Sequence, residues 1–367
     1  MEETLQLLSE LTKIGAPSGN EMELAAYVSR YMRTFAQEVE VDHLGNVMGL
    51  VTPRNPNGPR IMISAHMDEV SFMVHKIQPN GFLKITRNGG IPEKNLLGQL
   101  VEVLADGGAL KGLIGTRSHH LTGMDQRYQV VPIEDLFVDV GFRSKEEAEA
   151  AGVRIGTPIV YARTFFLNGS RIFSNALDDR IGITAMLEAG KRLVASNPNA
   201  EVWLVGSVQE EWSLRGILPA TRHLKPDMAL CIDIYPSTDT PDLDFKADLA
   251  LGGGPVVSEY NFHGRGTLMG LIPDPVLRDT AVEAAKQLGF PIQRGALIGV
   301  LTDASYVQYE GKGVATLDLA IPARYSHSAV ESCDVEDLKQ LIDLIVKTTE
   351  LWTASPKKTR RDVILGE

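Results

Sequence analysis

The sequence has 367 residues, 44% of them hydrophobic, and a formal net charge of −11 from 36 basic and 47 acidic side chains. This length can bury a sizeable core in more than one domain. The acidic balance argues against nucleic acid or an anionic membrane surface as a partner. Two cysteines and the lack of a membrane-length apolar run argue against a disulfide framework and a transmembrane helix. The first residues, MEETLQLLSELTKIG, lack the pattern of a signal peptide, so a cytoplasmic location is expected.

The first seventy residues predict two helices, a hairpin and a buried strand. Residues 2–14 have apolar positions at helical spacing, and APSGNE (16–21) breaks the chain before a second helix. Residues 38–51 alternate in polarity and turn at Leu-Gly-Asn, which predicts a hairpin. The run RIMISAH (60–66) is almost continuously apolar and therefore predicts a strand that is buried on both faces.

The middle of the chain changes in character. Residues 71–163 contain short β-like runs separated by glycines, and only 145–152 predicts a helix. Many short strands with turn signals are typical of a small barrel or sandwich. We therefore expect a β-rich domain at 71–163, inserted into a larger domain made of residues 1–70 and 164–355, with a mobile tail at 356–367.

Helices and strands alternate again in the second half of the chain. Helices are predicted at 178–195, 274–289 and 335–352, and strands at 201–209, 227–234 and 314–322. This alternation favours an α/β fold with a mixed, mostly parallel sheet flanked by helices.

Polar side chains gather where these strands end, and binding sites in open α/β sheets form beyond the carboxyl ends of the strands. The candidates there and at the start of the helix at 178 are His66, Asp68, Glu69, Asp178, Asp179, Glu210, Glu211, Asp233 and His327. Taken singly, each has an ordinary structural explanation; Asp178, for example, is a good helix N-cap. Taken together, buried carboxylates at one edge require a cation. Imidazole and carboxylate ligands suit zinc, and also cobalt or manganese.

The adjacent glutamates Glu210 and Glu211 suit two different tasks. Neighbouring residues of a strand point to opposite faces, but this constraint relaxes in the turn beyond the strand. One glutamate can then bind metal while the other stays free as a general base, taking a proton from a metal-bound water and delivering it to a leaving amine. One bridging carboxylate among five ligands could hold two metals about 3.5–4 Å apart.

Five segments resemble the tetrahedral (TET) aminopeptidase family of dinuclear metallopeptidases, metallopeptidase family 42, and the resemblance covers nearly the whole chain. They are AHMDEV (65–70), NALDDRIG (175–182), VQEEWSLRG (208–216), CIDIYPSTDTPD (231–242) and RYSHSAVE (324–331). The resemblance implies a zinc-exopeptidase-type catalytic domain interrupted by a small barrel-like dimerisation domain. It also implies a homo-oligomer, in which dimers assemble into a tetrahedral dodecamer.

The resemblance also implies the metal ligands. His66 and Asp233 resemble the terminal ligands of one metal, and Glu211 and His327 those of the other. Asp178 resembles the bridging ligand. The implied cofactors are two divalent ions, Zn²⁺ or Co²⁺, with Mn²⁺ as a further candidate.

The implied activity is that of a metal-dependent aminopeptidase, which removes N-terminal residues from short peptides through a water activated by two metals. Glu210 resembles its general base, and Asp68 resembles the carboxylate that orients His66. Three departures from the family pattern bear on substrate preference. They are Trp212-Ser213 after the paired glutamates, VLTDA at 300–304 and DTPD at 239–242. The loop 117–132 resembles one that reaches a neighbouring subunit's site in relatives, and its alternative is an ordinary surface loop.

Other functions stay open at this point. Carboxypeptidases and N-acyl-amino-acid deacylases share the fold, and the paired glutamates do not exclude them. A glycosidase needs two carboxyls across the scissile bond, for which adjacent glutamates with two histidines are poorly suited. A non-enzymatic protein that retained the site as a relic is disfavoured because every expected ligand is present.

Overall fold

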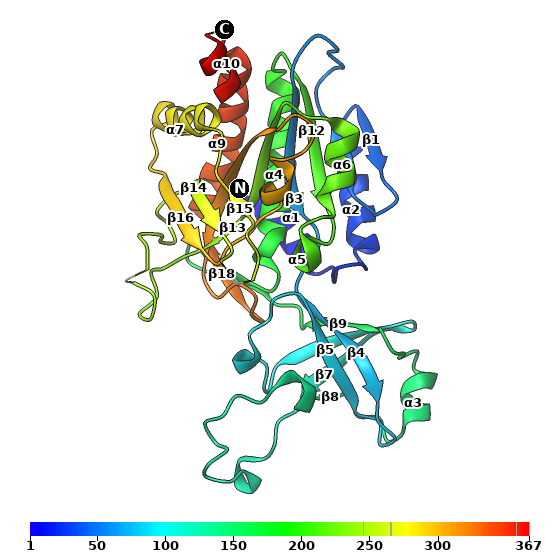
Figure 1. The fold of residues 1–367 in the computed structure, drawn as a ribbon. Coiled ribbons are helices and arrows are strands. Elements are labelled where there is room, and N and C mark those ends of the chain that lie inside the picture. The colour runs from blue at the N-terminus through cyan, green and yellow to red at the C-terminus, as the bar shows by residue number, and fades with distance from the viewer. Residues whose placement is uncertain (245, 265, 357, 367) are drawn as a thin grey trace.

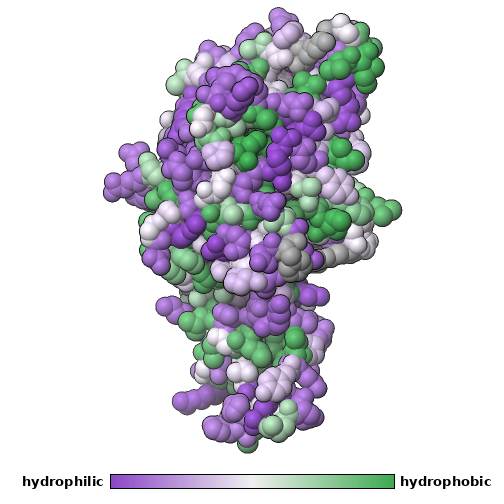
Figure 2. All heavy atoms as spheres, turned by 90° about the vertical axis from the view of Figure 1, so that its left-hand side faces the viewer, coloured by the Kyte–Doolittle hydropathy of each residue, from purple (hydrophilic) through white to green (hydrophobic). Residues whose placement is uncertain are grey.

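The computed structural model describes the whole chain except residues 245, 265, 357 and 367. It has a larger α/β body and a smaller β-barrel, which lies below the body in Figure 1. No helix within the described residues is long and apolar enough to cross a membrane. On the face shown in Figure 2, hydrophobic side chains lie in small groups among hydrophilic ones.

The body is built on a nine-stranded sheet with the order β1-β2-β12-β3-β13-β17-β14-β15, with β16 beside β14. The pairs β12–β3, β3–β13 and β13–β17 at its centre are parallel, while β1–β2 and β14–β17 are antiparallel. The strands are β1 (Glu38–Val41), β2 (Val47–Leu50), β3 (Arg60–His66), β12 (Glu201–Ser207), β13 (Met228–Pro236), β14 (Val256–Phe262), β15 (Gly270–Leu271), β16 (Gln293–Ile298) and β17 (Ala315–Ala323). The predicted α/β class and mixed sheet are confirmed.

Helices cover both faces of this sheet, which explains the continuous apolar runs in its central strands. Ile61 and Ile63 of β3 belong to the core beneath one set of helices, whereas Met62 belongs to the core on the opposite face. The first set comprises α1 (Glu2–Thr12), α2 (Met22–Met32), α4 (Leu177–Ser196), α7 (Pro275–Leu288) and α9 (Val335–Ala354). The second comprises α6 (Ile217–Leu224) and α8 (Ala304–Val307).

The short β-runs of the middle region form a closed barrel with its own core, as the fold prediction expected. Its strand order is β4-β5-β8-β7-β6-β9, and Phe72, Val103 and Ile159 lie in its interior cluster. The barrel elements are β4 (Ser71–Ile77), β5 (Leu83–Asn88), β6 (Leu100–Ala105), β7 (Gly108–Ile114), β8 (Val138–Asp139), β9 (Pro158–Tyr161) and the helix α3 (Lys145–Ala150). A separate three-stranded sheet consists of β10 (Phe165–Asn168), β11 (Arg171–Ser174) and β18 (Glu331–Asp334).

The described part of the tail contains the helix α10 (Arg360–Leu365), which the sequence analysis did not predict. Thr359 and Asp362 form a capping box, which satisfies N–H groups at the start of this short helix. The backbone N–H of Arg360 donates to Asp274, the N-cap of α7, at 3.0 Å. The tail is therefore attached to the body by a hydrogen bond that spans 86 residues of sequence.

Candidate metal centre

Six of the candidate side chains meet at the carboxyl edge of the central parallel strands. They come from segments far apart in the sequence, because parallel strands end at the same edge of a sheet. The six are His66 at the end of β3, Asp178 at the start of α4, Glu210 and Glu211 in α5 (Glu210–Ser213) after β12, Asp233 in β13, and His327 after β17.

Asp178 lies between the two imidazoles. Its Oδ1 atom is 3.0 Å from Nε2 of His66, and its Oδ2 atom is 3.4 Å from Nε2 of His327. Two groups of ligand atoms share it, one with His66 and Asp233 and one with Glu211 and His327, and the atoms of each group lie within 4.8 Å of one another. Each group offers an imidazole and two carboxylates, which is a donor set for a divalent transition metal.

Glu210 lies beside this cluster without joining either of the groups that contain Asp178. Its Oε2 atom is 4.0 Å from Nε2 of His66, and it forms a third group with His66 and Glu211. Glu211 instead places Oε1 3.3 Å from Nε2 of His327. The two glutamates therefore occupy different positions, although they are adjacent in the sequence.

The electrostatics of the cluster fit a bound cation. Burial raises the pKa of Glu210 and of Asp233 well above the usual range, and the nearby charges of Glu211 and Asp178, respectively, raise it further. Burial lowers the pKa of His66, but the charge of Glu210 and hydrogen bonding to Asp178 outweigh that effect and raise it. Oε1 of Glu211 is buried and accepts no hydrogen bond of good geometry from the described residues, although Nε2 of His327 lies 3.3 Å away. Without a cation, protons have to offset this negative charge; a divalent metal would do so while leaving the imidazoles neutral.

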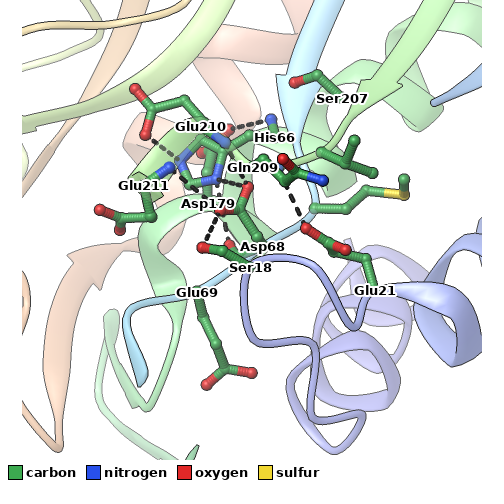
Figure 3. Close-up of polar contacts among 12 residues, drawn as sticks. Ser18, Glu21, His66, Asp68, Glu69, Asp179, Ser207, Gln209, Glu210 and Glu211 are labelled. Carbon is green, nitrogen blue, oxygen red and sulfur yellow. Dashed lines mark hydrogen bonds and ion pairs between the residues drawn. The ribbon is translucent and has the colours of Figure 1, made fainter. Parts of the chain in front are cut away.

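Asp68 has more partners than the sequence predicted. Its carboxylate lies 3.5 Å from Nδ1 of His66, and its own carbonyl oxygen is nearer to that nitrogen, at 3.2 Å. The carboxylate also accepts hydrogen bonds from the backbone N–H groups of Glu210 and Glu211, at 2.9 and 3.1 Å, and from the Ser18 hydroxyl at 2.6 Å (Figure 3). It therefore connects the end of β3 to the turn that carries the paired glutamates.

The alternative explanation of Asp178 as a helix cap is wrong. Its side chain faces the imidazoles, and its backbone is not helical. Asp179 has the capping geometry instead, because its Oδ1 accepts from the N–H of Gly182 at 3.0 Å. Oδ2 of Asp179 accepts a hydrogen bond from the backbone N–H of His66 at 3.3 Å. Asp179 therefore helps to hold the backbone of a candidate metal ligand in place.

The sequence analysis missed the part played by Glu331. This side chain is 2% exposed, and its two oxygens accept from the backbone N–H groups of Asp178, at 2.9 Å, and His327, at 2.8 Å. The only sequence signal was its place at the end of RYSHSAVE.

The loop 117–132 connects barrel elements, and none of its described residues joins the ligand groups.

A buried cluster of imidazoles and carboxylates at the carboxyl edge of a parallel sheet is the kind of metal-binding site that metal-dependent hydrolases use. The comparisons narrow this class to the aminopeptidases. A family model described as M42 glutamyl aminopeptidase matches residues 45–344, and the chain belongs to this family.

Individual relatives agree with this assignment. The chain is 33% identical to the lysyl aminopeptidase of Pyrococcus furiosus over 346 residues, which cover 92% of this chain and 94% of the relative. The structure of a TET aminopeptidase from the marine sediment archaeon Thaumarchaeota archaeon SCGC AB-539-E09 matches with a TM-score of 0.89 at 32% identity, covering 95% of this chain and 96% of that one. The TET1 peptidase of Pyrococcus horikoshii, which can assemble into a tetrahedron or a large octahedral shell, matches with a TM-score of 0.83 at 31% identity, covering 94% and 99%.

Proposed function

We propose that this chain is a two-metal aminopeptidase that removes N-terminal residues from short peptides. The observation that carries the proposal is the position of Asp178, whose two oxygens face different imidazoles and which belongs to both ligand groups. One carboxylate shared in this way is suited to bridge two metals. Family membership and the lysyl aminopeptidase relative support the choice of substrate.

The donor atoms divide into two sites. His66 and Asp233 would hold one metal, Glu211 and His327 the other, and Asp178 both. When bound, two divalent ions would polarise the scissile carbonyl and lower the pKa of the attacking water, and Zn²⁺, Co²⁺ and Mn²⁺ all suit this donor set.

Glu210 is the general base in this proposal. It is 7% exposed and lies beside the cluster, and the structure groups Glu211, not Glu210, with Asp178. Its carboxylate would accept a proton from the attacking water and then donate it to the departing amine. Asp68 supports this step through the backbone N–H groups of both glutamates.

The first test is hydrolysis of a panel of aminoacyl p-nitroanilides by the metal-free protein and by its Zn²⁺, Co²⁺ and Mn²⁺ forms. Metal-restored cleavage of free-amine substrates, with no cleavage of an N-acetylated control, is the expected result. Preferential cleavage of the acylated substrate would instead identify a deacylase. Sugar hydrolysis that is insensitive to chelators would identify a glycosidase. Absence of cleavage with every metal and side chain would contradict the proposal.

We further propose that the protein is a homo-oligomer. Residues 71–163 would be its dimerisation domain, and residues 1–70 with 164–355 its catalytic domain. The assembly of the Pyrococcus horikoshii relative supports this proposal. Light scattering on the purified protein should give the mass of a dimer or of a dodecamer, whereas a monomer at micromolar concentration would contradict it.

A further inference from the structure

The turn that carries the paired glutamates has little stability of its own. The helix α5 is four residues long, and Gln209 and Leu214 on either side of it adopt left-handed conformations with φ of 57° and 58°. A single helical turn is not stable in isolation, and non-glycine residues adopt such conformations only when their surroundings impose them. The position of Glu210 therefore depends on the contacts that hold this turn.

Two buried carboxylates from distant parts of the chain hold it. Three successive backbone N–H groups point at them: that of Gln209 donates to Oε1 of Glu21 at 3.1 Å, and those of Glu210 and Glu211 donate to the two oxygens of Asp68 (Figure 3). Asp68 follows β3, and Glu21 directly precedes α2. The Glu21–Gln209 contact spans 188 residues of sequence.

Glu21 does not act as the cap that its position in the sequence suggests. It occupies the N-cap position of α2, yet its side chain makes no capping hydrogen bond to that helix. Its Oε1 accepts instead from the N–H of Gly19, at 2.8 Å, and from that of Gln209. The residue is 4% exposed, and burial together with the charge of Asp68 raises the pKa of its carboxyl to about 6. Burying this carboxylate is costly, and its two hydrogen bonds join its own loop, at Gly19, to the turn, at Gln209.

The loop that presents Glu21 is itself fixed on several sides. The Ser18 hydroxyl donates to Asp68, the N–H of Ala16 donates to Glu69 at 3.0 Å, and the side-chain amide of Asn88 donates to the Ser18 carbonyl at 3.0 Å. Asn88 is the last residue of barrel strand β5. This loop is therefore held by both the body and the barrel. Through Glu21, it also holds the turn that carries the paired glutamates.

We propose that Glu21 is a positioning residue, which holds the general base Glu210 at its working distance through the N–H of Gln209. The proposal rests on the two-metal aminopeptidase function given above. Glu21 does not touch the reacting atoms, and its effect is confined to the placement of the turn. Such placement matters because a displacement of about 1 Å can reduce a catalytic rate about 100-fold.

The test compares Glu21→Ala and Glu21→Gln with a matched control, Asp337→Ala. Asp337 is also a buried carboxylate, 1% exposed, and accepts two backbone N–H groups, those of Gly252 and Gly254, with a pKa raised by burial to about 6. We expect Glu21→Ala to lower kcat by about 10-fold or more, with little change in KM or bound metal. Glu21→Gln keeps an acceptor oxygen and should recover most of kcat. Asp337→Ala should lower the melting temperature and leave kcat unchanged.

Three results would overturn the positioning role. They are a wild-type kcat in Glu21→Ala, an equal loss of kcat in Glu21→Gln, and a comparable loss in Asp337→Ala. If Glu21→Ala does not fold, Glu21→Asp takes its place, because it keeps the charge and shortens the reach to Gln209. If the wild-type protein cleaves no aminoacyl substrate with any metal, the proposed function itself fails and the positioning role falls with it.

Discussion

Oδ1 of Asp178 lies 3.0 Å from Nε2 of His66, although 112 residues separate the two in sequence. The contact joins the start of α4 to the end of β3, and both residues are almost completely buried. The other carboxylate oxygen of Asp178 faces a second imidazole, that of His327. These three side chains form the centre of the proposed metal site.

Asp178→Asn should weaken binding of both metals together, because one carboxylate contributes to both groups. The loss should exceed the roughly 10–100-fold that follows removal of an outer partner of a metal ligand. Calorimetric titration of the metal-free protein with Zn²⁺ measures this loss of metal affinity. The control is Asp239→Asn, which changes a carboxylate of an ion pair that lies outside the ligand groups. Two metals bound at wild-type affinity would remove Asp178 from the bridging position.

Glu210→Gln should keep metal bound and lower kcat by about 100-fold or more, because the amide cannot accept the proton of the attacking water. Glu211→Gln should instead reduce metal content, since its Oε1 faces His327. Metal analysis and steady-state kinetics of the two variants separate these roles. If Glu210→Gln lost metal and Glu211→Gln kept it, the two assignments would have to be exchanged.

Glu331→Ala should weaken metal binding about 10–100-fold, because its carboxylate orients the backbones of both Asp178 and His327. Removing the acceptor also leaves two buried N–H groups unpaired, at a cost of about 1–3 kcal/mol each. Thermal unfolding and metal titration should therefore both change. Asp337→Ala removes an equivalent buried acceptor elsewhere, so it should lower stability alone. Equal metal affinity in the two variants would show that Glu331 is only structural.

Asp318 should make the protein less stable as the pH rises towards neutrality. Burial raises the pKa of its carboxyl to about 7, despite hydrogen bonds from Thr302, Tyr235 and Asn261. The folded state therefore retains a proton that the unfolded chain releases above about pH 4. This contribution to stability is complete below about pH 4 and is lost as the pH rises through 7.

Urea unfolding of the wild type and of Asp318→Asn between pH 5 and 8 measures this effect. The wild-type free energy of unfolding, relative to that of the variant, should fall by about 1 kcal/mol per pH unit up to pH 7 and then level off. Contributions from other carboxylates cancel in the difference. A difference independent of pH would mean that Asp318 is ionised in the folded protein throughout this range.

Local sequence patterns predicted the fold class, the central strands and the barrel. Strands β3, β12, β13 and β17 are buried along nearly their whole length, so their apolar runs are continuous. Strands β14 and β16, at the end of the sheet beyond β17, were missed because their burial is mixed, which weakens the pattern. Helix α10 was missed although Thr359 and Asp362 have the spacing of a capping box.

The sequence by itself determined which ligand types stand at which strand ends, because residue types and the order of the strands are local properties. The family resemblance already implied Asp178 as the bridging ligand and Glu211 as a terminal ligand. Only the tertiary structure gives their contacts, with Asp178 facing two imidazoles and sharing a ligand group with Glu211 and not with Glu210. The same is true of Glu331 and Glu21, which act on the site through backbone N–H groups up to 188 residues away. No local pattern encodes such contacts, since they exist only after the sheet, the N-terminal loop and the barrel have packed together.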